Sequence, residues 1–189
     1  MASLFKSTKN TRSIMNDSMR YIRSDAIINL EYKEMQWLLE NNILTVVDLR
    51  TTEEVIENPC CLKDYTNFTY LNIPVSFGDE IPETPEMVPQ LYLKMVDGTM
   101  KKIISIIENS KTNVVYFCKS GKDRTGVVSA LLLLKQGISQ DHIISDYMLS
   151  ADNIKEVIEQ YCSDYPNVKK EALTPNPEYI KQFLKCVRL

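Results

Sequence analysis

The amino-acid sequence predicts an α/β fold of three layers, in which helices cover both faces of a mostly parallel central sheet. Short runs rich in β-branched residues alternate with segments of helical hydrophobic spacing, a pattern typical of parallel sheets. One run, NVVYFC at residues 113–118, is apolar at nearly every position, as in a strand buried on both faces. We therefore expect a sheet whose ligand-binding loops follow the carboxyl ends of its strands.

The first half of the chain predicts one helix and two strands. Residues 1–20 are polar and show no periodicity, so we predict no regular element there. Apolar residues recur at helical spacing over 31–42, which predicts a helix. The run ILTVVDLR at 43–50 predicts a buried strand, and YLNIPV at 70–75 predicts another that Pro74 interrupts.

The second half of the chain is more helical. Residues 76–90 contain three prolines and four acidic residues, which predicts a loop long enough to have a functional role. The other predicted elements are a helix at 91–110 interrupted near Gly98, the strand at 113–118, an apolar core helix at 124–137 ending at Gly137, and two or three short helices over 139–188.

Length and charge limit the possible classes of protein. The 189 residues suit one domain, spanning 1–189. The formal net charge is -3, from 22 basic and 25 acidic residues, which argues against a nucleic-acid-binding protein. Any anionic ligand must then be attracted by a local positive site.

Cysteine usage and hydropathy indicate a cytoplasmic protein. The five cysteines are odd in number and irregularly spaced, so we expect neither a disulfide framework nor a metal site. The single histidine, His142, argues against His-rich metal chemistry. No apolar run is long enough for a membrane span, and the N-terminal residues lack the pattern of a secretory signal.

The segment Cys118-Lys119-Ser120-Gly121-Lys122-Asp123-Arg124-Thr125-Gly126 carries the chemistry. It joins a predicted strand to a predicted helix, where backbone N–H groups and the helix dipole favour an anion. Gly121 permits a tight turn, and the planar guanidinium of Arg124 suits two oxygens of a phosphoryl group. The formal loop charge is +2, or +1 once Cys118 ionises, and this positive field favours a thiolate nucleophile.

Ordinary structural roles are the alternatives for these residues. Free cysteine is commonly a small buried hydrophobe, and arginine can pair with a nearby carboxylate. A bare Cys-x5-Arg spacing is weak evidence, but a glycine at the fourth place and Thr-Gly after the arginine make chance far less frequent. The hydroxyl of Thr125 is placed to donate to the sulfur or to stabilise it as a leaving group.

The string CKSGKDRTG resembles the phosphate-binding signature of the protein tyrosine phosphatase superfamily, and its Gly-Lys-Asp-Arg-Thr-Gly part resembles a bacterial branch of tyrosine and dual-specificity phosphatases. Flanking matches extend the resemblance over roughly residues 10–150. These are Arg23-Ser24-Asp25, Asp48-Leu49-Arg50 with Glu54, and Tyr147-Met148-Leu149-Ser150.

The resemblance implies a phosphatase that works through a phosphocysteine on Cys118 and needs no metal or organic cofactor. It implies phosphate binding by the guanidinium of Arg124 and by the backbone amides of residues 119–124, which are Lys119, Ser120, Gly121, Lys122, Asp123 and Arg124. The bacterial branch suggests Asp123 as general acid. Asp79, on the proline-rich loop, is comparable with the mobile acid of other members, and Glu80 beside it is a weaker candidate.

One departure and several rival hypotheses remain open. Phe117 stands where the family usually has histidine, which leaves room for a phosphate-binding module without turnover. Phosphotyrosine on a protein is the first substrate hypothesis, and phosphoinositides or inositol phosphates are the rival, because Lys119 and Lys122 resemble the loop of lipid phosphatases. A sulfurtransferase is a weaker third hypothesis. Asp48 and Arg50 are expected to form a structural ion pair.

Overall fold

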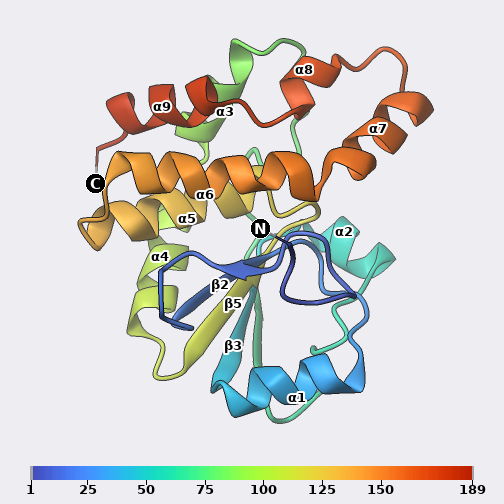
Figure 1. Cartoon of the computed structure of the whole chain (residues 1–189), viewed down its shortest axis with the longest axis vertical. Coiled ribbons are helices and arrows are strands. Elements are labelled where there is room, and N and C mark those ends of the chain that lie inside the picture. The colour runs from blue at the N-terminus through green and yellow to red at the C-terminus, as the bar shows by residue number, and fades with distance from the viewer. Residues whose placement is uncertain (1, 189) are drawn as a thin grey trace.

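The computed structural model describes residues 2–188, built around one five-stranded sheet (Figure 1). The strands lie in the order β1-β2-β5-β3-β4, and every neighbouring pair is parallel except the edge pair β1 and β2. Their bounds are β1 Arg12–Ser13, β2 Tyr21–Ser24, β3 Ile43–Asp48, β4 Thr69–Asn72 and β5 Asn113–Phe117. The predicted mostly parallel sheet is confirmed.

The helices of the described part are α1 Tyr32–Glu40, α2 Thr52–Glu57, α3 Met87–Lys94, α4 Gly98–Asn109, α5 Asp123–Lys135, α6 Gln140–Asn153, α7 Lys155–Asp164, α8 Lys170–Leu173 and α9 Pro177–Cys186. The predicted break near Gly98 is real, because Asp97 caps the N-terminus of α4 there by accepting from the Met100 amide. The helix that ends before Gly137 is also confirmed. None of the described helices is long and apolar enough to cross a membrane.

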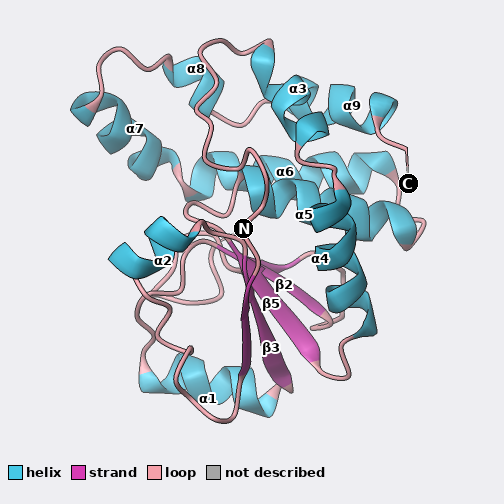
Figure 2. Cartoon of the chain, turned by 180° about the vertical axis from the view of Figure 1, so that it is seen from behind, coloured by secondary structure: helices cyan, strands magenta, loops and turns pink. Residues whose placement is uncertain are grey.

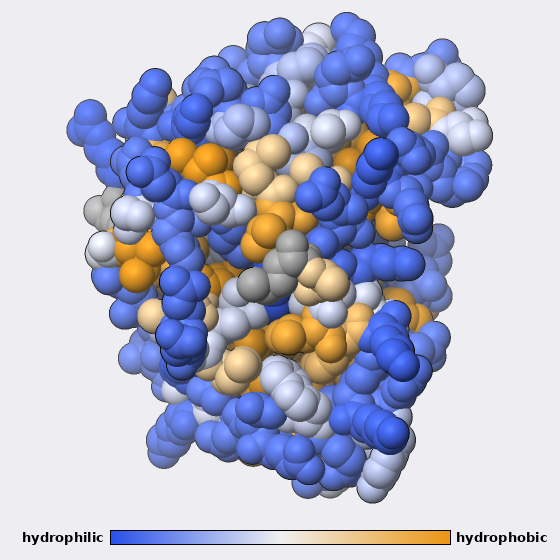
Figure 3. Space-filling model, in the orientation of Figure 1, coloured by the Kyte–Doolittle hydropathy of each residue, from blue (hydrophilic) through white to orange (hydrophobic). Residues whose placement is uncertain are grey.

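Strand β5 shows why the fold has three layers. Val114 and Tyr116 face a core formed with α3, α4, α5, α6 and α9, whereas Val115 and Phe117 face a second core beneath α1. Figure 2 shows α1 on one side of the strands and α4 on the other. On the face shown in Figure 3, hydrophobic residues gather toward the middle and hydrophilic residues dominate the periphery. The sequence-based prediction of layers on both faces is therefore confirmed.

Three predictions about secondary structure were wrong in detail. The polar N-terminal region contains β1, and β2 follows it undetected because Arg23 and Ser24, although fully buried, read as surface residues. Helix α3 begins at Met87, inside the predicted loop at 76–90. The described part beyond residue 139 contains four helices, whereas two or three were predicted.

Candidate active site

The loop between β5 and α5 makes a turn that only glycine fits at residue 121. Gly121 has a φ of +67°, in the left-handed region that side chains disfavour. A Cβ atom placed there would lie 2.5 Å from the backbone oxygen of Ser24 and 2.7 Å from the backbone nitrogen of Asp25. The glycine thus lets the loop pack directly on the carboxyl end of β2.

We expect Gly121→Ala to destabilise the fold by about 2–5 kcal/mol, from about 1–2 kcal/mol of backbone strain and about 1–3 kcal/mol of overpacking. Gly137→Ala is a matched control, because Gly137 has a φ of +69° but no atom within 4 Å of the added Cβ. Gly137→Ala should lower the free energy of unfolding by the backbone strain alone, about 1–2 kcal/mol. Equal losses for the two variants in denaturant unfolding would contradict the close packing inferred here.

Three consecutive carbonyl groups of the loop point outward, toward the N-terminal segment. The Lys119 oxygen accepts from the Ala26 amide at 3.1 Å, and the Ser120 and Gly121 oxygens each accept from Asn10 Nδ2 at 3.1 Å. In a trans peptide the next N–H points opposite to the carbonyl. The amides of residues 120–122 therefore face the inside of the loop.

These inward amides have no acceptor. Among the hydrogen bonds of the described residues, no backbone N–H of residues 119–125 donates to a protein atom. Such unpaired donors at the start of a helix as long as α5 form a favourable anion site. The sequence-based expectation of converging amides thus agrees with the geometry.

A buried polar cluster holds the loop in this shape. Arg23 donates to the Gly121 oxygen at 2.7 Å and also pairs with Asp146 of α6, which pairs with Arg12 at 2.8 Å. Burial opposes ionisation of Asp146, but the charges of the two arginines outweigh it and lower the pKa of that carboxyl. Asn10, which also contacts Ser150, was missed because it lies in a stretch without periodicity.

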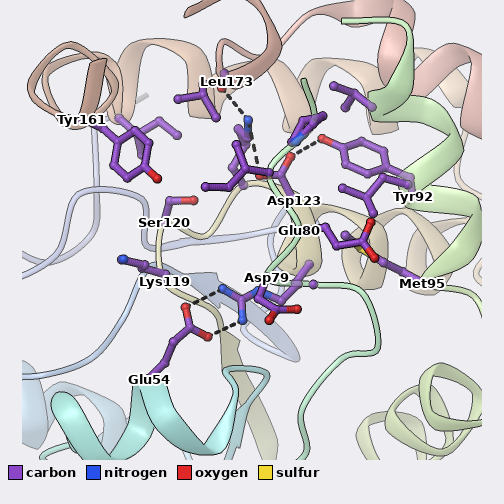
Figure 4. Close-up of a pocket in the computed structure, with 18 of the residues that line it drawn as sticks. Glu54, Asp79, Glu80, Tyr92, Met95, Lys119, Ser120, Asp123, Tyr161 and Leu173 are labelled. Atoms are coloured by element: carbon purple, nitrogen blue, oxygen red, sulfur yellow. Dashed lines mark hydrogen bonds and ion pairs between the residues drawn. The ribbon is translucent and has the colours of Figure 1, made fainter. Parts of the chain in front are cut away.

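Arg124 is held by Glu54 in a two-point ion pair. Arg124 is nearly buried, and its two terminal nitrogens contact the Glu54 carboxylate oxygens at 2.5 and 2.9 Å. In Figure 4, dashed lines mark the two contacts that Glu54 makes. Burial acts to raise the pKa of Glu54, but the hydrogen bonds and charge of Arg124 overcome it, so the net shift is downward. The side chain expected to bind phosphate is thus aligned by a residue from α2.

Cys118 lies deeper than expected. Its side chain is 2% exposed and packs in the core on the α5 side, whereas the sequence predicts a thiol that a ligand reaches directly. The pocket wall is formed instead by its neighbours Lys119 and Ser120 and by the residues that follow. The segment around Gly78 lies so close to Arg124 that an added Cβ would be 2.3 Å from Arg124 Cδ. This tight approach leaves little free space on that side of the Arg124 side chain.

Thr125 also differs from the expectation. Its side-chain oxygen is buried and has no hydrogen-bond partner among the described residues, so the predicted bond to the Cys118 sulfur is not formed. A buried hydroxyl without a partner is costly and unusual in proteins. The Thr125 hydroxyl is therefore a hydrogen-bond donor without a partner among the described residues, next to the loop.

Asp123 is positioned by Tyr92, which sequence reasoning missed, and Tyr92 in turn contacts Tyr147, which belongs to one of the flanking matches named above. The Tyr92 hydroxyl of α3 donates to Asp123 Oδ1 at 2.5 Å, and Tyr147 of α6 contacts the same hydroxyl at 2.9 Å. Burial and the Asp123 charge raise the pKa of Tyr92 well above its ordinary value, so this phenol stays protonated as a donor. Figure 4 shows Asp123 turned toward Tyr92 at the upper side of the pocket.

The two loop lysines have different environments. The Lys122 ammonium donates to the Leu173 carbonyl oxygen of α8 at 2.5 Å and lies 3.3 Å from Asp123 Oδ2, and the side chain is buried. It therefore ties the C-terminal helices to the loop, which departs from its predicted role as a phosphate contact. Lys119 is exposed at the pocket.

Phe117 occupies a fully buried position beneath the loop. Its ring lies 5.3 Å from the guanidinium carbon of Arg50, within cation–π range. Arg50 pairs with Asp48 at 2.6 Å, so the predicted structural ion pair is confirmed. The position expected to hold histidine thus contributes packing and one cation–π contact.

A cavity of about 570 Å³ opens beside the loop. Asp79 and Glu80 from the 76–90 loop line it, together with Asp123, Arg124 and Tyr92, so both candidate acids border the same space. Within residues 2–188, no group of three or more potential metal-ligating side chains converges. The chemistry of the pocket is that of an anion site with adjacent carboxyl groups.

Comparisons with known proteins agree with this geometry. Residues 7–189 match the family model described as the tyrosine phosphatase family. A tyrosine-protein phosphatase of Nostoc commune is 24% identical over 115 residues, which cover 56% of this chain and 39% of that protein. The chain thus spans about two fifths of the length of the curated relative it matches.

Among solved structures, human DUSP28 is similar to this chain, with 12% sequence identity and a TM-score of 0.48. The match covers 98% of this chain and 95% of DUSP28. TpbA of P. aeruginosa, solved in complex with pTyr, has 13% identity, a TM-score of 0.43 and coverage of 95% and 97%. Tk-PTP in its active form has 16% identity, a TM-score of 0.46 and coverage of 94% and 98%.

Proposed function

Because the chain belongs to the tyrosine phosphatase family, we propose that it is a cysteine-dependent phosphatase that hydrolyses phosphomonoesters, with phosphotyrosine on a protein as its substrate. The observation that carries this proposal is the set of unpaired amides at residues 120–122, which face the inside of the loop, together with Arg124 at the pocket. Such a site complements the equatorial oxygens of a phosphoryl group, where transition-state charge resides.

The proposed reaction has two chemical steps. The Cys118 thiolate attacks phosphorus in line with the leaving oxygen, which departs with a proton from the general acid. A phosphocysteine is formed, and water activated by the resulting carboxylate then hydrolyses it to inorganic phosphate. The buried hydroxyl of Thr125 is free to stabilise the sulfur when it leaves. No metal or organic cofactor is needed in this scheme.

The burial of Cys118 adds a requirement to this proposal. Only 2% of the residue is exposed, and the segment around Gly78 packs against Arg124. We therefore propose that this segment and the Arg124 side chain shift when phosphate enters. Glu54 then serves as a counter-ion that keeps Arg124 aligned for its new partner.

We propose Asp123 rather than Asp79 as the general acid. Asp123 lies at the N-terminus of α5 and is held by Tyr92 and Lys122, whereas Asp79 is exposed and makes no hydrogen bond with another described side chain. A carboxyl group held in one orientation is better suited to proton transfer than one that no side chain positions.

Asp123→Asn should lower kcat/KM for alkyl and phenyl phosphates by about 10²–10⁴-fold, the usual contribution of a general acid. The loss should be much smaller for an aryl phosphate with an acidic leaving group, which departs without protonation. Asp79→Asn is the matched comparison and should change both rates by less than about threefold. A leaving-group-dependent loss in Asp79→Asn, but not in Asp123→Asn, would reverse the assignment.

The rival substrate class is disfavoured by the position of Lys122. Contact with extra phosphates on an inositol ring requires free cations, and the Lys122 ammonium is bonded to Leu173 and Asp123. Lys119 is then the remaining loop lysine beside the pocket. Kinetics with phosphotyrosine peptides and a panel of phosphoinositides decide between the classes: higher kcat/KM on polyphosphorylated rings would overturn the proposal.

The alternative hypothesis, a module that binds phosphate without hydrolysing its ester, rests on Phe117 alone. Turnover of a generic aryl phosphate by the purified chain would exclude it, whereas phosphate binding without turnover would support it. We further propose a reducing, cytoplasmic location, since the mechanism needs Cys118 as a free thiol. Every cysteine of the chain is free in the structure.

A further inference from the structure

We propose that the cavity beside the loop contains a second, apolar subsite, which binds a hydrophobic side chain next to the phosphotyrosine of a peptide substrate. The inference rests on the proposed phosphatase function and specifies its substrate. A cavity of about 570 Å³ falls within the range for drug-sized ligands, larger than a single phosphorylated ring requires. Space therefore remains for a neighbouring part of the substrate.

The wall away from the loop is apolar and comes from separate segments. Leu91 and Met95 lie on α3, Ile81 lies on the 76–90 loop, and Val157 and Ile158 lie on α7. Figure 4 shows Met95 on the α3 side of the pocket and Tyr161 of α7 on the opposite side. The phosphate-binding loop and this wall thus border one continuous space.

Two residues of the wall are unusually exposed for their type. Ile81 is 49% exposed and Val157 is 44% exposed, although both border the cavity. A bound apolar side chain would remove this surface from water, which is favourable. Both residues also lie within the same pocket as Ser120 of the loop, so one short peptide can contact the two subsites together.

The charges of the wall favour a peptide over a phosphoinositide. Carboxylates of Glu53, Asp79 and Glu80 border the cavity, whereas Lys119 is the nearby exposed cation. Like charges at close range repel, so further phosphates beside these carboxylates would weaken binding. A substrate with one phosphate and an apolar flank meets no such penalty.

Two pairs of phosphotyrosine peptides would test the subsite. The two peptides of a pair differ only in carrying leucine or serine beside the phosphotyrosine, on its N-terminal side in one pair and on its C-terminal side in the other. On at least one flank, wild-type kcat/KM should be about tenfold higher for the leucine peptide, a difference of about 1.4 kcal/mol. Val157→Asn should remove that preference and leave turnover of a small aryl phosphate unchanged, because it adds a polar group but no charge. Tyr32→Asn is the matched control, because Tyr32 is 72% exposed on α1, outside the pocket lining, and should keep the preference.

Equal kcat/KM for the leucine and serine peptides on both flanks, or a preference that survives Val157→Asn, would overturn the subsite. Higher kcat/KM on phosphoinositide vesicles than on every peptide would overturn it as well. A chain that turns over no aryl phosphate would instead refute the proposed function. In that event peptide binding to Cys118→Ser, measured by fluorescence anisotropy, still decides the subsite, because the preference for leucine must appear in affinity.

Discussion

Cys118→Ser should abolish turnover, with kcat on an aryl phosphate falling by at least about four orders of magnitude. A serine hydroxyl has nearly the same shape but is not ionised at neutral pH, so it is a far weaker nucleophile than a thiolate. Each factor of ten corresponds to about 1.4 kcal/mol of lost transition-state stabilisation, so the expected loss is at least about 5 kcal/mol. Phosphate binding should survive, because the amides of the loop and Arg124 remain in place.

Cys61→Ser provides the control for this experiment. Cys61 is a partly buried free cysteine in the core beneath α1, away from the loop, and its replacement should leave kcat within about twofold. Steady-state kinetics on both variants, with circular dichroism to verify folding, make the comparison. Substantial turnover by folded Cys118→Ser would exclude the phosphocysteine route.

Arg124→Lys should lower kcat/KM by about 10³-fold or more, the range seen when a transition-state arginine is removed from phosphoryl-transfer enzymes. Lysine keeps the positive charge but cannot offer two parallel N–H groups to two oxygens. The structure shows the fork already in two-point contact with a carboxylate, at 2.5 and 2.9 Å. Glu54 takes two of the five guanidinium N–H groups, and a phosphoryl group would bind those that remain.

Glu54→Gln separates the two parts of this effect. The amide keeps the size of the side chain but removes the charge that aligns Arg124, so we expect an intermediate loss of about tenfold to a hundredfold. Steady-state kinetics of both variants with the same aryl phosphate show which loss of kcat/KM is larger. A loss for Glu54→Gln as large as that for Arg124→Lys would mean that the ion pair, and not the phosphate contact, is what Arg124 provides.

The loop was predictable because its residue types are restricted by local chemistry. A glycine with a φ of +67°, an arginine at a helix start and an apolar strand before them each leave a mark in the sequence. The strands β3 and β5 were found for the same reason, since their β-branched runs are buried on both faces. In each case the cause lies within a few neighbouring residues.

The parts that escaped prediction depend on contacts between distant segments. Strand β2 is hidden because Arg23 is buried by pairing with Asp146, more than a hundred residues away. Tyr92 holds Asp123 across 31 residues, and Asn10 holds Gly121 across 111. The depth of Cys118 and the engagement of Lys122 by Leu173 are likewise set by tertiary packing. A single sequence carries no local signal for such pairs.

The proposed function depends on the turn before α5 keeping Cys118 as a nucleophilic thiolate. The covalent state of the Cys118 sulfur during turnover is the direct test of this requirement. Wild-type protein quenched with acid while it consumes an excess of aryl phosphate, then digested and examined by mass spectrometry, should carry phosphate on the peptide that contains Cys118. Steady hydrolysis with that peptide unmodified, or with phosphate on any other residue, would contradict the account.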